Sequence, residues 1–189
     1  MDDRLINELK RSKGNYELAA LMAVVEVETG GRGFDPATGR ILIQFEPSWF
    51  RRKAPYAPSG KWSVNKVDVQ KKEWEAFSDA FSKNANAAME STSIGLAQIM
   101  GFHYRRLGYK TVGQMWDDAK TGIEAQVRQL IRFIDTDSRL ALAVKVHDWA
   151  RVATIYNGAG FRALARKYGR QPYDQALRAA YNKYARQYK

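Results

Sequence analysis

Apolar residues recur at helical spacing near the start of the chain. The segment that begins at Tyr16, YELAALMAVVEVE, runs to the Gly30-Gly31 pair, and paired glycines are typical of a helix end. Its apolar positions follow the i, i+3, i+4, i+7 pattern of one helix face, and they are Leu18, Leu21, Met22 and Val25. We therefore predict a buried helix that ends at this glycine pair.

Helical spacing returns in the later part of the chain. Trp74, Phe77 and Phe81 predict a helix over residues 67–89, and the apolar run SIGLAQIMGF that follows is interpreted as a helix with the polar Gln98 inside it. Three further helices are predicted at residues 121–134, 138–155 and 173–188, with Gly158 and Gly160 breaking the chain between the last two.

One short segment alternates between apolar and polar residues as a strand does. It is ILIQFE, which follows the turn-rich GFDPATGR and is closed by Pro47. One predicted face holds Ile41, Ile43 and Phe45, and the other holds Leu42, Gln44 and Glu46. The pattern predicts a mainly helical α+β protein with a small β element. Without repeats or low-complexity linkers, we expect one domain over residues 1–189.

Composition narrows the chemistry that the chain can perform. The 189 residues are 45% hydrophobic and 27% charged, as in globular proteins. The absence of cysteine excludes disulfides, thiolate catalysis and sulfur-ligated zinc. The chain has only two histidines, His103 and His147, so a metal site built from histidines is not expected either. We therefore predict an activity that needs no metal or cofactor.

The formal net charge of +11 indicates a polyanionic partner, which leaves nucleic acid, an acidic membrane surface and a wall polymer open. Aromatic residues interleaved with the basic ones, such as Trp49, Tyr56 and Trp62, would suit base stacking in a nucleic-acid-binding module. The chain has no phosphate-binding glycine loop, zinc spacing or RNP-like pattern, so we expect no specific nucleic acid partner. The C-terminal ALRAAYNKYARQYK suits a membrane-active helix or, as we expect, a packed terminal helix.

Two carboxylates lie in the last turn of the first predicted helix, at Glu26 and Glu28. The partial negative charge of a helix C-terminus and an apolar environment both raise the pKa of a carboxyl group. A raised pKa is what a general acid needs near neutral pH. The alternative interpretation is a solvated pair of glutamates at a frayed helix end, and helix geometry does not choose between Glu26 and Glu28.

A second candidate carboxylate, Glu46, ends the predicted strand. Inverting glycosidases hold their two carboxyl groups about 6.5–9.5 Å apart and retaining ones about 5–5.5 Å, so a pair of Glu28 and Glu46 facing across a cleft is chemically reasonable. The alternative is a structural ion pair between Glu46 and Arg51 or Arg52.

Three motifs bring a family into view. Glu28-Thr29-Gly30-Gly31 resembles the Glu-Ser turn of goose-type lysozymes and soluble lytic transglycosylases, and residues 95–100, GLAQIM, resemble their Gly-Leu-Met-Gln-Ile-Met motif. Tyr156-Asn157-Gly158 resembles their Tyr-Asn-Ala-Gly motif, and the three motifs occur in the family's order. The whole pattern, including ILIQFE and HDWARVATIYNG, is most similar to the N-acetylmuramidase catalytic domain of phage endolysins.

The resemblance implies that Glu28, not Glu26, is the general acid of an enzyme that cleaves the β-1,4 bond between N-acetylmuramic acid and N-acetylglucosamine in peptidoglycan. Cleavage would be by hydrolysis, with a lytic transglycosylase as the alternative. We assign catalysis to Glu28 and Glu46, and substrate binding to Gln44, Ser93, Gln98, Tyr156 and Asn157. For Gln98 the alternative is an internal hydrogen bond to a loop carbonyl, and for Tyr156 and Asn157 a buried tyrosine with a capping asparagine.

Many endolysins of this family resemble two-part proteins with a wall-binding module before the catalytic domain, and because the first motif helix begins within the first twenty residues here, we expect no separate wall-binding module. The basic surface is therefore expected to attract the protein to anionic wall polymers or outer-membrane lipids. The N-terminus MDDRLINELKRSKGN lacks the features of a signal peptide. We expect a monomer made in the host cytoplasm without a signal peptide, which acts on the wall in the periplasm or outside the cell after release.

Overall fold

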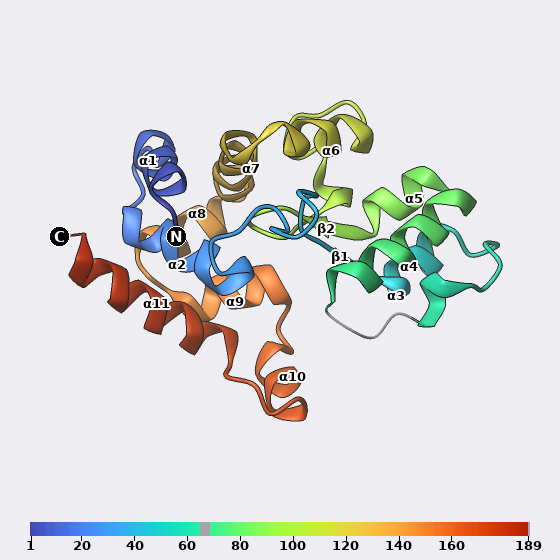
Figure 1. Cartoon of the computed structure of the whole chain (residues 1–189). Helices are drawn as coiled ribbons and strands as arrows, with labels where there is room; N and C mark the ends of the chain where they lie inside the picture. The colour runs from blue at the N-terminus through green and yellow to red at the C-terminus, as the bar shows by residue number, and fades with distance from the viewer. Residues whose placement is uncertain (65–68, 189) are drawn as a thin grey trace. The chain divides into compact units, whose positions relative to one another are not determined.

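The computed structural model describes residues 1–64 and 69–188, which are mostly helical and include one small sheet (Figure 1). This confirms the predicted fold class. The chain divides into two compact units, one made of Met1–Gly31 with Ile131–Lys189 and the other of Arg32–Leu130. That residues 1–189 form one domain stays a prediction. Within the described ranges, no helix combines the length and apolar character that crossing a bilayer requires.

The first unit is helical, and its centre is the helix predicted near the start of the chain. Its helices are α1 (Asp3–Ser12), α2 (Leu18–Thr29), α8 (Ser138–Lys145), α9 (Trp149–Asn157), α10 (Phe161–Lys167) and α11 (Tyr173–Gln187). Both α1 and α11 pack on α2. Residues 19–25 of α2 are at most 6% exposed, so burial extends all round the helix and not only over the predicted face. The helix begins two residues after Tyr16, whose side chain is also buried.

The end of α2 is set by glycine, as predicted. Gly30 adopts a left-handed backbone conformation with φ 62°, and its N–H donates to the carbonyl oxygen of Glu26 at 2.9 Å. Gly31 N–H donates to the carbonyl of Val25 at 3.3 Å. These bonds satisfy carbonyls that the helix end leaves without partners, and residues with a side chain rarely adopt this conformation. Glu28 is therefore held in the last turn.

The helices predicted in the second half are confirmed in part. Helices α7 (Ile123–Asp135) and α11 match the helices predicted at residues 121–134 and 173–188. The division between the two units falls within α7. The predicted helix over residues 138–155 is wrong as one element, because α8 and α9 are separate. His147 between them has φ 57°, and the Asp148 side chain caps α9 by accepting from the N–H of Arg151 at 3.1 Å.

The second unit contains the sheet and the helices around it. Its elements are β1 (Ile43–Phe45), α3 (Pro47–Lys53), the 3-10 helix η1 (Lys61–Val64), α4 (Gln70–Lys83), α5 (Ala85–Glu90), β2 (Thr92–Ile94), β3 (Ile99–Met100), the 3-10 helix η2 (Gly101–His103) and α6 (Val112–Thr121). The strand order is β1-β2-β3 with both pairings antiparallel. Ile43 and Phe45 are buried and Gln44 is exposed, which confirms the predicted alternation.

Side chains of α4 cover the free edge of β1. The N–H of Ile43 donates to Gln70 Oε1 at 3.0 Å, and Gln70 Nε2 donates back to the Ile43 carbonyl at 2.8 Å. The N–H of Phe45 donates to Glu73 Oε2 at 2.7 Å. An edge strand otherwise leaves such groups without partners. The contacts therefore join α4 firmly to the strand.

Two predictions for this unit are wrong. The helix predicted over residues 67–89 is two helices, α4 and α5. Asn84 ends the first and caps the second, because its side-chain oxygen accepts from the N–H of Ala87 at 2.9 Å. Residue 67 lies outside the described residues. The run SIGLAQIMGF is not a helix but the hairpin of β2 and β3. Gly95 and Gln98 form its turn with φ 68° and 46°, values that end regular pairing.

Candidate active site

Glu28 and Tyr173 form a hydrogen-bonded pair in the first unit. Tyr173, the first residue of α11, donates its hydroxyl hydrogen to Glu28 Oε1 in the last turn of α2. Burial raises the pKa of Glu28 to about 7, because desolvation of the carboxylate outweighs the opposing hydrogen bond from Tyr173. A substantial fraction of Glu28 therefore carries a proton at neutral pH. A protonated carboxyl group is able to act as a general acid.

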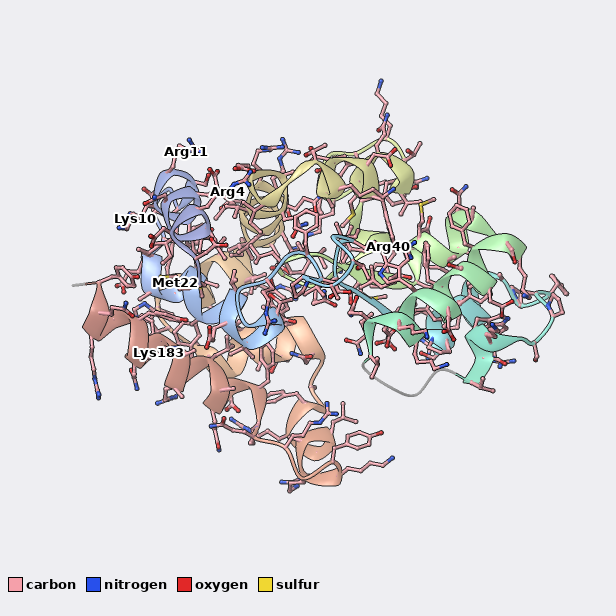
Figure 2. The ribbon with its side chains drawn as sticks, viewed as in Figure 1. Arg4, Lys10, Arg11, Met22, Arg40 and Lys183 are labelled. Carbon is pink, nitrogen blue, oxygen red and sulfur yellow. The ribbon has the colours of Figure 1, made fainter. Side chains whose placement is uncertain are left out.

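Glu26, two residues earlier, has the opposite electrostatic environment. The hydroxyl of Tyr184 donates to one of its oxygens at 2.8 Å, and Lys183, labelled in Figure 2, donates to the other at 3.2 Å. The Tyr184 hydrogen bond first, and then Lys183, lower the pKa of Glu26 below its ordinary value. The expectation that both glutamates have a raised pKa is thus wrong for Glu26, because specific partners outweigh the helix end.

Tyr156 lies beside the Glu28–Tyr173 pair. Its ring stacks on that of Tyr173 with centroids 6.3 Å apart, and it meets Phe133 edge-on at 5.2 Å. Burial, and then the charge of Glu28, raise the pKa of Tyr173 well above its ordinary value, so Tyr173 remains a hydrogen-bond donor. Asn157, also predicted to bind substrate, is exposed at the end of α9.

Three of the predicted substrate-binding residues come together on the sheet of the second unit. Gln44 on β1 and Ser93 on β2 are partners in the strand register. Ser93 Oγ donates to Gln98 Oε1 at 2.9 Å, and Gln98 Nε2 donates to the Gly95 carbonyl at 2.8 Å. The internal bond to a loop carbonyl that we weighed for Gln98 is therefore present. Its role in substrate binding stays a prediction.

Glu46 lies at the junction of β1 and α3, where it is the residue before Pro47. Its N–H donates to the Ser91 carbonyl at 2.9 Å, which extends the contact between β1 and the start of β2. The guanidinium groups of Arg51 and Arg52 lie over the Trp62 and Trp49 rings, at 5.0 and 5.1 Å. Glu28 and Glu46 belong to different units, and their facing one another stays a prediction.

Sequence reasoning missed Tyr173, the direct partner of Glu28. The two residues are separated by 145 positions, and no local pattern links them. The signal that the sequence does offer is weak, because an aromatic residue that begins a helix has many structural roles. The sequence predicts Trp74 only as an apolar position of a helix, and it does not predict the contact with Arg40, whose guanidinium carbon lies 5.1 Å from the centroid of the indole ring.

A mainly helical fold with a small antiparallel sheet, and a protonatable glutamate at the end of a buried helix, define a protein of the lysozyme-like class. Residues 17–185 match the N-acetylmuramidase family, and the chain belongs to that family. It is similar to the crystal structure of the Burkholderia AP3 phage endolysin, with a TM-score of 0.78 and 31% identity over 97% of this chain and 71% of the endolysin chain. No curated protein matches the chain. The family assignment makes this a peptidoglycan-degrading enzyme.

Proposed function

We propose that the protein hydrolyses the β-1,4 bond between N-acetylmuramic acid and N-acetylglucosamine, with Glu28 as general acid. The observation that carries the proposal is a glutamate whose pKa burial raises to about 7, held by a tyrosine at the end of a helix. Protonated Glu28 donates its proton to the glycosidic oxygen as the bond from that oxygen to the muramic acid C1 breaks. Water then adds to C1 of the resulting oxocarbenium-like sugar, the proton that it loses passes to solvent, and Glu28 regains a proton from solvent.

Tyr173 acts in this scheme as a positioning residue. Its hydrogen bond to Oε1 restricts rotation of the Glu28 carboxyl group, and the stacked Tyr156 ring restricts Tyr173 in turn. Tyr156 and Asn157 would offer an aromatic face and an amide to a sugar. Gln44, Ser93 and Gln98 would supply polar contacts from the sheet.

The second candidate reaction is that of a lytic transglycosylase. There the O6 hydroxyl of the muramic acid attacks C1 in place of water and leaves a 1,6-anhydro sugar, and one acid/base glutamate suffices. Mass spectrometry of the soluble products from purified peptidoglycan distinguishes the two. Hydrolysis predicts muropeptides with an ordinary reducing end, heavier by one water than the anhydro products. Anhydro products would show that the enzyme is a lytic transglycosylase that cleaves the same bond. If no muropeptides were released at all, both candidate reactions would be refuted.

Glu46 is proposed to support catalysis by orienting the attacking water or by stabilising positive charge on the sugar. The variant Glu46→Gln should then lower turnover per folded molecule with little change in melting temperature, since the amide keeps the shape of the side chain. If Glu46 were instead the partner of a buried ion pair, the variant would lose about 3–5 kcal/mol of stability while its folded fraction worked normally. Measuring melting and turnover on the same sample separates these outcomes.

We also propose that positive charge recruits the enzyme to anionic wall or outer-membrane polymers. Residues 149–173 carry five cations and no carboxylate, and these cations are Arg151, Arg162, Arg166, Lys167 and Arg170; Arg162 is paired with Asp174, the residue that directly follows this segment. Lysis of whole walls is expected to weaken as salt rises, because exposed charges are screened over about 8–10 Å at physiological ionic strength. The rate on a short neutral oligosaccharide should change less. Equal salt dependence on both substrates would remove recruitment as the cause.

A further inference from the structure

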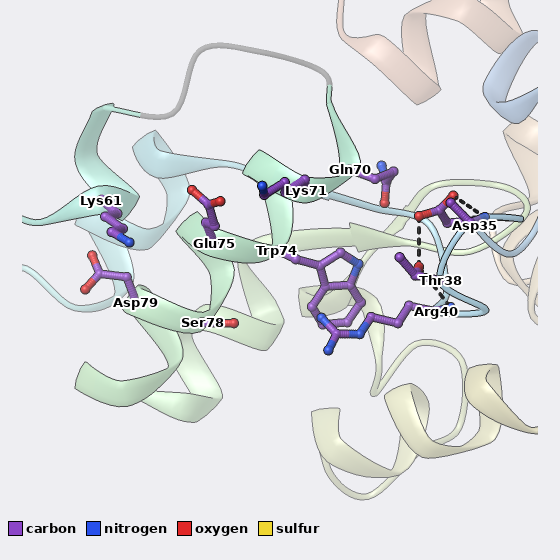
Figure 3. Close-up of a pocket in the computed structure, with 11 residues that line it drawn as sticks. Asp35, Thr38, Arg40, Lys61, Gln70, Lys71, Trp74, Glu75, Ser78 and Asp79 are labelled. Atoms are coloured by element: carbon purple, nitrogen blue, oxygen red, sulfur yellow. Dashed lines mark hydrogen bonds between the residues drawn. The ribbon is translucent and has the colours of Figure 1, made fainter.

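A cavity of about 740 Å³ lies in the second unit, outside the residues assigned to the reaction (Figure 3). Its walls are the turn at residues 35–40, the start of η1 and one face of α4. Arg40 lies across the indole ring of Trp74, with the guanidinium carbon 5.1 Å from the ring centroid. The cavity thus presents a cation that is held against an aromatic ring.

The Trp74 ring is held from behind by other aromatic residues. Phe77 and Trp116 meet it edge-on, with centroids 5.4 and 6.3 Å away. Its Nε1 is buried and has no hydrogen-bond partner among residues 1–64 and 69–188. A buried indole donor without an acceptor is unusual, and it lies in a residue that lines the cavity. The Trp74 ring is therefore packed against two other aromatic rings, and its indole N–H is left without an acceptor among the described residues.

The carboxylates that line the cavity already have partners. Asp35 accepts from the N–H of Ala37 at 3.0 Å and from Thr38 Oγ1 at 2.8 Å. Glu75 forms an ion pair with Lys72 at 3.0 Å. Asp79 forms an ion pair with Lys83 and accepts from the N–H of Trp62 at 3.0 Å. Three lining cations, Arg40, Lys61 and Lys71, have no carboxylate at ion-pair distance within the described part of the chain. The lining thus holds three carboxylates and three cations, and an anionic ligand would be met by Arg40, Lys61 and Lys71.

The cavity is joined to the strand that carries predicted substrate-binding residues. Gln70 lines the cavity, and its amide group binds both backbone groups of Ile43, the residue before Gln44. A ligand in the cavity would thus lie against a helix that is tied directly to β1. A polymer that contacts the sheet through its sugars would have this cavity within the same unit for a side branch.

We propose that this cavity binds the acidic stem peptide of peptidoglycan, an inference that rests on the proposed function for its choice of polymer. Stem peptides branch from the muramic acid residues of the glycan and carry free carboxylates. Arg40, which is held against the Trp74 ring, and Lys71 would bind these carboxylates through charge-assisted hydrogen bonds. The site would make cleavage sensitive to whether a glycan segment bears peptides.

The test compares two substrates, intact peptidoglycan and the same glycan stripped of its peptides by an amidase. The double variant Arg40→Gln/Lys71→Gln should lower kcat/KM on intact peptidoglycan about tenfold, with little change on the stripped glycan. The matched control is Arg105→Gln/Lys110→Gln, which also removes one arginine stacked on an aromatic ring and one exposed lysine from the second unit. The control should affect both substrates equally and slightly.

Binding of an isolated tripeptide, L-Ala-D-Glu-diaminopimelate, measured by calorimetry tests the site without catalysis. The parent should bind it, and the double variant should bind it at least several-fold more weakly. Equal losses of kcat/KM on both substrates, no binding of the tripeptide, or binding of inorganic polyphosphate in its place would each overturn the inference. Tripeptide binding by a protein that degrades neither substrate would instead refute the proposed function and leave the peptide site standing.

Discussion

Replacing Glu28 with Gln is expected to lower wall degradation at least about a hundredfold and, at the same time, to stabilise the fold at neutral pH. The activity is lost because an amide keeps the shape of the side chain but has no acidic proton to donate. Stability rises because the parent ionises a buried carboxyl group and the variant does not. Loss of activity with a gain of stability is unusual for a substitution that merely damages packing.

The sign of this stability effect follows from the pKa of Glu28. Its ordinary value is 4.5 and its folded value is about 7, so the folded state holds the proton more tightly than the unfolded state. Below pH 4.5 both states are protonated and the group has no effect on the free energy of unfolding. Between pH 4.5 and 7 its cost to the folded state grows, and above pH 7 it levels off at about 3 kcal/mol. Glu28→Gln should relieve this cost at pH 8 and not at pH 4, as urea unfolding would show.

Glu26→Gln is the control for this variant. It weakens the contacts with Tyr184 and Lys183 but leaves Glu28 and Tyr173 in place, so most of the activity should remain. Its stability should fall slightly at neutral pH, the reverse of the Glu28 result, because its pKa is lowered in the folded state. Full turbidity clearing by Glu28→Gln, or unfolding at pH 8 indistinguishable from the parent, would show that Glu28 is not the buried acid.

The pH dependence of activity should report Glu28 and respond to Tyr173. In the parent, the rate should fall above about pH 7, by about tenfold for each further pH unit, as Glu28 loses its proton. Tyr173→Phe removes a donor that stabilises the carboxylate, so the pKa of Glu28 rises and the alkaline fall moves to higher pH. The maximal rate should drop, because the carboxyl group is no longer positioned.

Tyr184→Phe provides a matched control, since Tyr184 donates to Glu26 as Tyr173 donates to Glu28. Its pH profile should keep the parent's alkaline fall. A Tyr173→Phe profile that is lower everywhere but unshifted would assign Tyr173 a structural role only.

Short sequence patterns were sufficient to predict elements whose conformation depends on neighbouring residues. The glycine pair that ends α2 and the alternation of Ile43, Gln44 and Phe45 were both predicted, because a left-handed cap and a two-residue period depend on neighbouring residues. The hairpin of residues 92–100 was not predicted. An apolar run this short fits a strand or a helix equally well, and its turn depends on Gln98 adopting a left-handed conformation.

The candidate site was predictable only in part for a related reason. The family motifs identify Glu28 as the candidate acid, whereas position at the end of the helix does not distinguish Glu28 from Glu26. What separates their pKa values is burial, which dominates at Glu28, and the contacts of Glu26 with Tyr184 and Lys183 on a helix more than a hundred residues later in the chain. The Arg40–Trp74 contact also joins elements that are distant in sequence. Such pairings depend on tertiary packing, which no local pattern encodes.

A carbon-13 NMR titration of the Glu28 side-chain carboxyl group in the folded protein tests whether Glu28 holds a proton near neutral pH. Its resonance is assigned as the one that disappears in Glu28→Gln. We expect a midpoint near pH 7 for Glu28 and a midpoint below 4.5 for Glu26. A Glu28 midpoint at or below 4.5 would contradict the account, because the carboxyl group would then be ionised at the pH where it must donate a proton.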